Sequence, residues 1–187
     1  MNNETAGQKQ ASCLRLKRKW ICMNNILTTA YIKEMQAEYT AAKKCLERIP
    51  INLYEYKPHP KSMNLGYLAL LVAEIPLWIS VAVTKGVIDF TTFRHFEPGT
   101  SQALLEHFEN NFESAIVALQ QTTDEALEGF FVLRNGETEL IRQTKKECIS
   151  SSINHWVHHR GQLTVYMRLN DILVPSIYGP SADEKAF

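Results

Sequence analysis

The sequence of 187 residues lacks both an excess of charge of one sign and a regular arrangement of cysteines. Its 20 lysines and arginines balance its 20 aspartates and glutamates, so the formal net charge is zero. Proteins that bind nucleic acid need a surplus of basic side chains for the phosphates, so this composition argues against that class. The four cysteines, Cys13, Cys22, Cys45 and Cys148, contain no Cys-x-x-Cys pair. This spacing gives no zinc or dithiol motif, and four cysteines are too few for a disulfide scaffold of this length.

A long apolar run without charges is also missing. The most apolar stretch, Leu65–Val83, has nearly the ~20 residues that a transmembrane helix needs. However, Glu74 lies in its middle, where an acidic side chain costs roughly 2.5–3.5 kcal/mol on insertion, and Pro76 follows it. Residues 1–22 are basic but lead into no apolar segment of the signal-peptide type. We therefore expect a buried core helix and a cytoplasmic protein with no membrane partner.

The neutral total divides into two unlike parts. Residues 1–22 hold five basic residues and one acidic residue, whereas residues 23–187 hold fifteen basic and nineteen acidic residues. The triplet Met23-Asn24-Asn25 also repeats Met1-Asn2-Asn3. We expect residues 1–22 to form a disordered basic leader and residues 23–187 to form one mildly acidic helical domain. An acidic domain further argues against a nucleic-acid partner.

Apolar residues recur every three or four positions in four long stretches, which indicates amphipathic helices. The stretches are residues 23–49, about 63–84, 101–121 and about 146–169. Pro50 ends the first, Ser62 is a candidate N-cap of the second, and Pro76 predicts a kink or break inside it. Thr100 or Ser101 is a candidate cap of the third. The stripe of the first stretch consists of Leu27, Tyr31, Met35, Tyr39, Ala42, Leu46 and Ile49.

The segments between these stretches contain turn-forming residues. Residues 85–99 are expected to form a loop, and residues 171–187 hold two prolines and a glycine that prevent a continuous helix. Residues 130–133 precede Asn135-Gly136, a turn signal, so a small hairpin is conceivable there. Four long helices with little strand signal predict an all-α four-helix bundle. A small hairpin or irregular segment would lie between its third and fourth helices.

The chemistry-bearing cluster is a run of histidines in the fourth helical stretch. His155 and His159 are four residues apart and share one helix face with Cys148, Ser152, Gln162 and Tyr166. Two imidazoles at this spacing can chelate one divalent ion, although buried pairs often only hydrogen-bond to neighbours. His158 is rotated by about 100° from His159 and cannot easily join the pair. No His-Glu-x-x-His motif is present, which argues against a zinc protease, and two histidines leave the coordination shell short.

Three parts of the chain carry a resemblance to a known family. The first is residues 57–66 (Lys-Pro-His-Pro-Lys-Ser-Met-Asn-Leu-Gly), which run on into residues 73–78 (Ala-Glu-Ile-Pro-Leu-Trp). The second is residues 154–163 (Asn-His-Trp-Val-His-His-Arg-Gly-Gln-Leu) with residues 165–169 after them. The third is residues 174–184 (Val-Pro-Ser-Ile-Tyr-Gly-Pro-Ser-Ala-Asp-Glu). Over about residues 26–184 the chain resembles the DinB-like (DinB/YfiT) superfamily, whose members are four-helix bundles that hold a divalent metal between helices.

The resemblance implies a metal site of three histidines. Two of them fall on His155 and His159 of the last helix. The first belongs to a pattern similar to His-Leu-Ala-Glu-Ile-Pro-x-Trp on the second helix, where this chain reads Leu71-Val72-Ala73-Glu74-Ile75-Pro76-Leu77-Trp78. The position of the first histidine is therefore Leu71, and leucine cannot coordinate a metal. Two imidazoles with waters could still bind zinc or nickel weakly.

Several residues are candidates to complete such a site. Glu74 lies one turn beyond Leu71, and it is either a third ligand or a structural carboxylate that pairs with Arg160 or a backbone group. His59 and His95 could fold in from loops, although a solvated position is the simpler expectation for both. Besides Leu71, Gln162 and Tyr166 are expected to line the same cavity as hydrogen-bonding groups. Arg160 is expected to be a structural ion-pair partner.

Three functional hypotheses follow from the resemblance. In the first, the cavity survives, Leu71 degrades the metal site, and the protein binds a small molecule or has a structural role. In the second, the protein is a divalent-metal-dependent enzyme like the thiol-dependent transferases, isomerases and hydrolases among its relatives, and the ion activates a low-molecular-weight thiol or water. In the third, it is a self-associating module, a homodimer, with Tyr31, Tyr39 and Trp20 as exposed aromatic residues. Leu71 favours the first, with zinc or nickel bound weakly or not at all.

Overall fold

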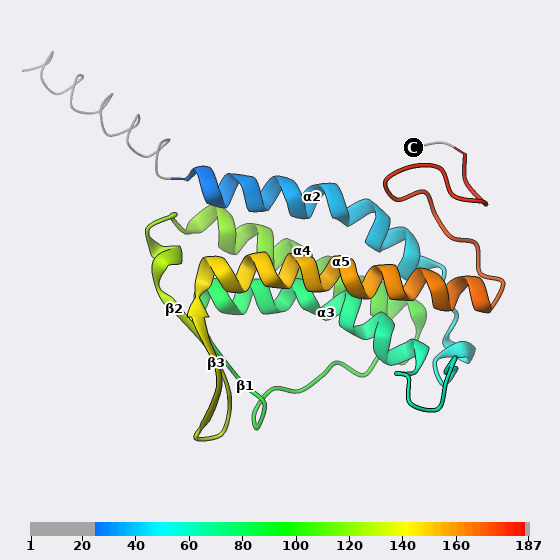
Figure 1. Ribbon diagram of the computed structural model, residues 1–187, viewed down its shortest axis with the longest axis horizontal. Helices are drawn as coiled ribbons and strands as arrows, with labels where there is room; N and C mark the ends of the chain where they lie inside the picture. The colour runs from blue at the N-terminus through cyan, green and yellow to red at the C-terminus, as the bar shows by residue number, and fades with distance from the viewer. Residues whose placement is uncertain (1–24, 186–187) are drawn as a thin grey trace, which may run out of the picture.

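The computed structural model describes residues 25–185 (Figure 1). Its four long helices are α2 (Ile26–Glu47), α3 (Leu65–Thr84), α4 (Ser101–Gln121) and α5 (Lys145–Leu169). One sheet contains β1 (Val87–Asp89), β2 (Phe130–Asn135) and β3 (Thr138–Thr144), and two 3-10 turns are η1 (Ile51–Leu53) and η2 (Ala126–Glu128). The prediction of an all-α protein is therefore wrong in this respect, although the predicted hairpin is present. The predicted leader, residues 1–22, lies outside the described residues, as does Trp20.

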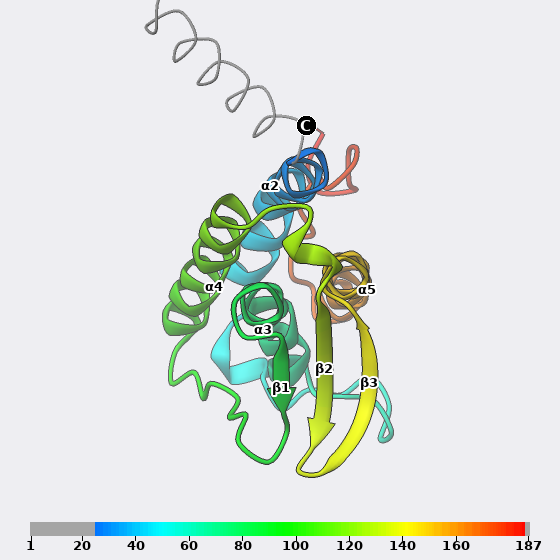
Figure 2. The same ribbon diagram turned by 90° about the vertical axis from the view of Figure 1, so that its left-hand side faces the viewer.

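The helices form a bundle with α3 at its centre, as the end-on view in Figure 2 shows. α3 packs against both α4 and α5, and α2 packs mainly against α4. Fourteen of the 20 residues of α3 are buried. This helix is long and apolar enough to cross a membrane, but 72% of its most apolar window lies inside the protein. The expectation of a buried core helix is confirmed, and a cytoplasmic location stays a prediction.

The apolar stripe predicted for the first helix forms the buried face of α2. Met35, Ala42 and Leu46 are inaccessible to solvent and belong to the main core. The first turn of α2 is capped from a distance, because the carboxylate of Asp124 accepts hydrogen bonds from the backbone N–H groups of Leu27 and Thr28 at 2.8 and 2.9 Å. A carboxylate at a helix N-terminus satisfies free N–H groups and interacts favourably with the helix dipole.

Two aromatic residues that were expected on the surface pack inside the bundle instead. Tyr31 is buried, and its hydroxyl donates to the carbonyl of Lys146 at 2.9 Å. Tyr39 is half-buried, with its ring centroid 4.5 Å from that of Phe112, and its hydroxyl contacts Glu109 at 3.1 Å. The expectation that these two side chains are exposed is therefore wrong. Their burial follows from their positions in the apolar stripe of α2. The homodimer stays a prediction without support from these side chains.

The helix caps differ in part from the sequence predictions. Asn64, not Ser62, caps α3, and its side chain accepts from the N–H of Tyr67 at 2.8 Å. Thr100 caps α4 as one of the two candidates predicted. α5 begins with a capping box, in which the Thr144 hydroxyl and the Glu147 carboxylate each bond to the other residue's backbone N–H. α3 also continues through Pro76 without the predicted break.

The small sheet extends the fold beyond one end of the bundle. β1 pairs in parallel with β2, with Ile88 opposite Leu133, and β2 pairs antiparallel with β3. The turn at Asn135-Gly136, where Gly136 has a φ of 62°, agrees with the predicted hairpin. β1 was predicted as part of a loop, because three residues give too short a pattern to recognise as a strand. Its register matters for function, since β1 fixes where the segment 90–100 begins.

Side chains beneath the sheet hold β1 in place. Ile88 packs with Phe131 and Cys148 in a separate apolar cluster against α3 and α5. Asp89 accepts hydrogen bonds from the hydroxyl of Thr91 at 2.7 Å and from the backbone N–H of Gly136 at 3.0 Å. These hydrogen bonds, first of all the one from Thr91, hold the pKa of Asp89 at about 2. The apolar packing of Ile88 and the hydrogen bonds of Asp89 therefore both fix the start of the segment that leads to α4.

Gly66 in the first turn of α3 offers a direct test of this packing. An added Cβ would lie 2.7 Å from Cβ, Cγ and Cδ2 of Tyr54, whose half-buried ring packs against the core. We expect Gly66→Ala to lower the free energy of unfolding by ~1–3 kcal/mol through overpacking, measured by urea denaturation. Gly161→Ala is the matched control, because its Cβ meets nothing within 4 Å in mid-helix and is expected to stabilise by ~0.5–1 kcal/mol. Equal stabilisation by both changes would contradict the packing at Tyr54.

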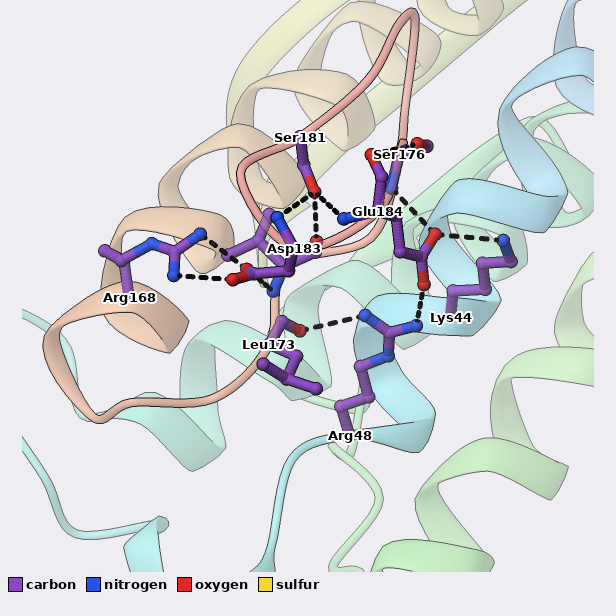
Figure 3. Close-up of polar contacts among 9 residues, drawn as sticks. Lys44, Arg48, Arg168, Leu173, Ser176, Ser181, Asp183 and Glu184 are labelled. Atoms are coloured by element: carbon purple, nitrogen blue, oxygen red, sulfur yellow. Dashed lines mark hydrogen bonds and ion pairs between the residues drawn. The ribbon is translucent and has the colours of Figure 1, made fainter. Parts of the chain in front are cut away.

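The C-terminal segment, residues 170–185, turns back from α5 and lies against α2 (Figure 3). Glu184 pairs with the Arg48 guanidinium and, at 3.3 Å, with Lys44. Asp183 pairs with Arg168 of α5 at 2.6 Å. The hydrogen bond from Arg48 and the backbone N–H of Ser176 hold the pKa of Glu184 at about 2. The segment, which is nonhelical as predicted, thus ties the two helices together through charged groups.

Candidate functional site

A cavity of about 290 Å³ lies between α3, α5 and the segment that joins β1 to α4. Its walls are mainly apolar and aromatic, with three imidazoles and one carboxylate among them. The lining residues are Met63, Tyr67, Leu71, Glu74, Ile75, Trp78, Phe90, His95, His155 and His159. An apolar cavity with a few converging polar groups is the common form of a small-molecule site, and this one is at the small end of the usual range.

The two histidines predicted on one face of the last helix do meet in this cavity. The ring centroids of His155 and His159 are 4.4 Å apart. His159 is buried, and its Nδ1 lies 2.8 Å from the side-chain oxygen Oε1 of Gln162, one turn further along α5. His158 is exposed and does not line the cavity, although its ring lies 5.3 Å from that of His159. The prediction that His158 cannot join the pair therefore agrees with the structure.

Both cavity histidines of α5 are shifted towards their neutral forms. Burial, followed by the neighbouring rings of His159 and His158, lowers the pKa of His155. Burial also lowers the pKa of His159, which its hydrogen bond to Gln162 opposes. Removing a cation from water disfavours the charged imidazole. At neutral pH these two rings therefore offer lone pairs and N–H groups and add no positive charge to the cavity.

Leu71 lies in the wall of the same cavity, on the helix opposite the histidine pair. The resemblance placed the first metal-binding histidine at this position, so the structure puts an apolar side chain where that ligand would stand. Among residues 25–185, no group of three histidine, cysteine, aspartate or glutamate side chains is arranged to hold a metal ion. Of the three positions that the resemblance implies, two therefore carry imidazoles, His155 and His159.

Glu74, the candidate third ligand, has both carboxylate oxygens occupied. The side chain is only 1% exposed. Its Oε2 lies 2.5 Å from Nδ1 of His95, and its Oε1 accepts from the backbone N–H of Phe96 at 2.8 Å. The predicted alternative of a structural carboxylate bonded to a backbone group is thus present. The alternative partner, Arg160, is wrong, because that guanidinium lies elsewhere in the bundle.

A second histidine beside Glu74, His107 of α4, completes the surroundings of its carboxylate. Its Nε2 lies 3.5 Å from Oε1 of Glu74, too far for a good hydrogen bond. Phe96 stacks on its ring with centroids 4.3 Å apart. Burial lowers the pKa of His107, although Glu74 opposes this shift. The direct hydrogen-bond partners of the buried carboxylate are therefore His95 and the backbone of the segment that joins β1 to α4.

His95 was expected to be a solvated loop residue, and its side chain is indeed 39% exposed, but it also forms part of the cavity wall. Its ring packs edge-on against Phe93 and Tyr67, with centroids 5.2 and 5.7 Å away. Glu74 and His95 are 21 residues apart, and no spacing in the sequence predicts their contact. The only prediction that anticipated this position was that His95 could fold into the site from a loop. His59, the other loop histidine, is exposed as expected.

The remaining residues predicted to line the cavity lie behind its walls. Gln162 does not line the cavity itself, but its side chain is hydrogen-bonded to His159, which does. Tyr166 is half-buried, and its hydroxyl donates to the carbonyl of Met63 at 3.2 Å. Both side chains therefore position lining residues, whereas Leu71 borders the cavity directly.

Arg160 lies on the other side of α5, in a buried polar cluster. Its side chain is 2% exposed and pairs with Glu38 of α2, with Nη1 2.5 Å from Oε2. Nη2 donates to the hydroxyl of Tyr178 at 2.9 Å, and that hydroxyl contacts Glu38 at 3.0 Å. The prediction of a structural ion-pair partner is confirmed. This cluster fixes the rotation of α5, and with it the direction of the two cavity histidines.

Comparison with known proteins decides the family. The sequence pattern of the DinB family matches residues 23–186, which is most of the chain. This chain belongs to the DinB family. The Bacillus subtilis (strain 168) protein YrdA is 26% identical to it over 170 residues, an alignment that covers 83% of this chain and 90% of YrdA.

Solved structures of DinB-like proteins share the fold. A DinB-like protein from Bacillus subtilis, YjoA, matches with a TM-score of 0.62 and 18% identity, and the match covers 84% of this chain and 99% of YjoA. One from Bacillus cereus ATCC 10987 matches with a TM-score of 0.59 and 20% identity, over 79% and 95% of the two chains. A DinB-family member from Exiguobacterium sibiricum 255-15 has a TM-score of 0.58 and 13% identity, over 81% and 96%.

The donor set of this DinB chain does not fit a three-ligand metal site. Structural and catalytic zinc sites use three or four protein ligands. Here Leu71 replaces one of them, and Glu74 could serve only by leaving His95 and the N–H of Phe96. Breaking these contacts would cost the His95 imidazole and the Phe96 N–H their hydrogen bonds to this carboxylate, which is unfavourable.

Proposed function

We propose that this DinB-family protein binds a small organic molecule in the cavity between α3 and α5, without a metal-dependent activity. The observation that carries the proposal is Leu71 in the cavity wall opposite His155 and His159. It removes one ligand and adds apolar surface, and both changes favour an organic ligand. The engagement of both oxygens of Glu74 supports the same conclusion.

Metal analysis of the full-length protein, purified without a nickel column, tests this proposal. We expect well below one equivalent of zinc or nickel, with no difference among the wild type, His155→Ala and His59→Ala. His59 is the matched control because it is a histidine exposed on a loop away from the cavity. The measurement is elemental analysis by mass spectrometry after extensive dialysis.

One tightly held equivalent that His155→Ala loses and His59→Ala retains would contradict the proposal. It would favour the second hypothesis, a divalent-metal-dependent enzyme. Loss of the same equivalent in His95→Phe would then identify His95 as the replacement ligand, since metal-bound imidazoles commonly donate their other N–H to a carboxylate.

A further inference from the structure

Two of the cavity histidines have one ring nitrogen already engaged. The N–H at Nδ1 of His95 donates to the Glu74 carboxylate at 2.5 Å, and that at Nδ1 of His159 donates to Oε1 of Gln162 at 2.8 Å. In its neutral form an imidazole has one N–H and one lone pair, and in that form these contacts place the lone pair of each ring on Nε2. Within residues 25–185, neither Nε2 has a hydrogen-bond partner. The cavity therefore presents two hydrogen-bond acceptors that are set by their neighbours.

The rest of the lining favours a flat apolar body between these acceptors. Tyr67, Trp78 and Phe90 are aromatic, and Leu71 and Ile75 are aliphatic. Aromatic side chains bind rings through stacked or edge-on contacts. The volume of about 290 Å³ leaves room for one ring with a short substituent.

We propose that the cavity binds a single-ring aromatic molecule carrying a hydroxyl or amino group, which donates hydrogen bonds to Nε2 of His95 and His159. The inference rests on the proposed function and names the ligand class of the same cavity. A purely apolar ring would displace water from both acceptors without replacing its hydrogen bonds, which is unfavourable. An anionic ring would bring acceptor oxygens and negative charge against two lone pairs and the Glu74 carboxylate. Only a donor-bearing ring satisfies the acceptors.

Three probes of one shape separate these possibilities. Benzyl alcohol carries a donor, toluene carries no polar group, and benzoate carries only acceptors. We expect benzyl alcohol to bind at least ~10-fold more tightly than toluene, because toluene displaces water from the two acceptors without replacing its hydrogen bonds, and benzoate to bind most weakly. Titration of the full-length protein followed by NMR gives the three dissociation constants.

Variants connect the preference to the named nitrogen atoms. His95→Phe keeps a ring against Tyr67 and Phe93 but removes Nε2, so we expect the advantage of benzyl alcohol over toluene to fall to less than ~3-fold. His59→Ala is the matched control and should leave all three affinities unchanged. Near-ultraviolet circular dichroism checks that His95→Phe, which leaves Glu74 without its partner, is still folded.

A nitrogen measurement on the wild type keeps the test independent of that variant. In protein labelled with ¹⁵N-histidine at pH 8, we expect His95 and His159 to carry their hydrogen on Nδ1. Benzyl alcohol should shift the Nε2 resonances of these two rings, whereas toluene should leave them in place. Hydrogens on Nε2 of both rings would overturn the inference.

Other outcomes also have distinct meanings. Tighter binding of benzoate or toluene than of benzyl alcohol overturns the ligand class and leaves a small-molecule cavity intact. Failure of all three probes to bind at millimolar concentration overturns the inference as well. The proposed function is judged separately by the metal content of the wild type and His155→Ala.

Discussion

Replacing Arg160 with methionine is expected to lower the free energy of unfolding by about 3–5 kcal/mol, because it leaves an uncompensated charge in the interior. The guanidinium is 2% exposed and bonds to the Glu38 carboxylate and the Tyr178 hydroxyl. Without it, the largely buried Glu38 keeps only the phenol as a side-chain donor. Chemical denaturation followed by far-ultraviolet circular dichroism measures the loss.

A matched surface variant and a double variant separate charge from packing. Arg142→Met removes an arginine whose pair with Glu139 is half-exposed, and it should hardly change stability. The double change Glu38→Leu with Arg160→Met should recover much of the loss, since apolar replacement of both members of a buried pair is often tolerated. Equal effects of Arg160→Met and Arg142→Met would show that the cluster contributes nothing to stability.

Introducing histidine with Leu71→His is expected to create a metal site and to raise zinc affinity at least ~10-fold, since even the loss of an outer-shell partner costs ~10–100-fold. Position 71 lies in the cavity wall with His155 and His159. Burial lowers the pKa values of the last two rings, so at neutral pH little energy is spent on removing protons before a metal binds. Competition with a chromogenic chelator measures the affinity.

Leu71→Phe is the control for this experiment, because it changes the shape of the cavity without adding a ligand. It should leave zinc affinity at the wild-type value. His155→Ala in the Leu71→His background should remove the gain. If Leu71→His binds zinc no more tightly than the wild type, the correspondence between position 71 and the family's first histidine is wrong.

The helices were predictable because their signal is local. The stripe that contains Met35, Ala42 and Leu46 repeats at helical spacing, and its burial follows from periodicity alone. The capping box of α5 has an equally local signal, the Thr-x-x-Glu pattern of Thr144-Lys145-Lys146-Glu147. Of the kink or break predicted at Pro76, the break is absent, because the buried helix α3 is packed on both sides and continues at the cost of one backbone hydrogen bond.

The half of the site that depends on tertiary structure could not be predicted. His155 and His159 share a helix face by spacing, and the cavity wall contains both. The contact of Glu74 with His95 depends on where the eleven-residue connection 90–100 runs, and that path depends on the three-residue strand β1. Strands this short carry no usable periodicity. Arg160 and Glu38 are 122 residues apart, so no local sequence pattern predicts that they pair.

The Glu38 cluster also sets an order for folding during synthesis. α2 emerges from the ribosome early, but its carboxylate must wait for Arg160 and Tyr178, which follow 122 and 140 residues later. Contacts of such long sequence separation form late, after the entropy of closing large loops has been overcome. Until then, the exposed apolar face of α2 and its unpaired charge are open to chaperones and to misassociation. The last stretch of the described chain therefore acts as the closing step of the bundle, and a pause in translation before it would lengthen the vulnerable period.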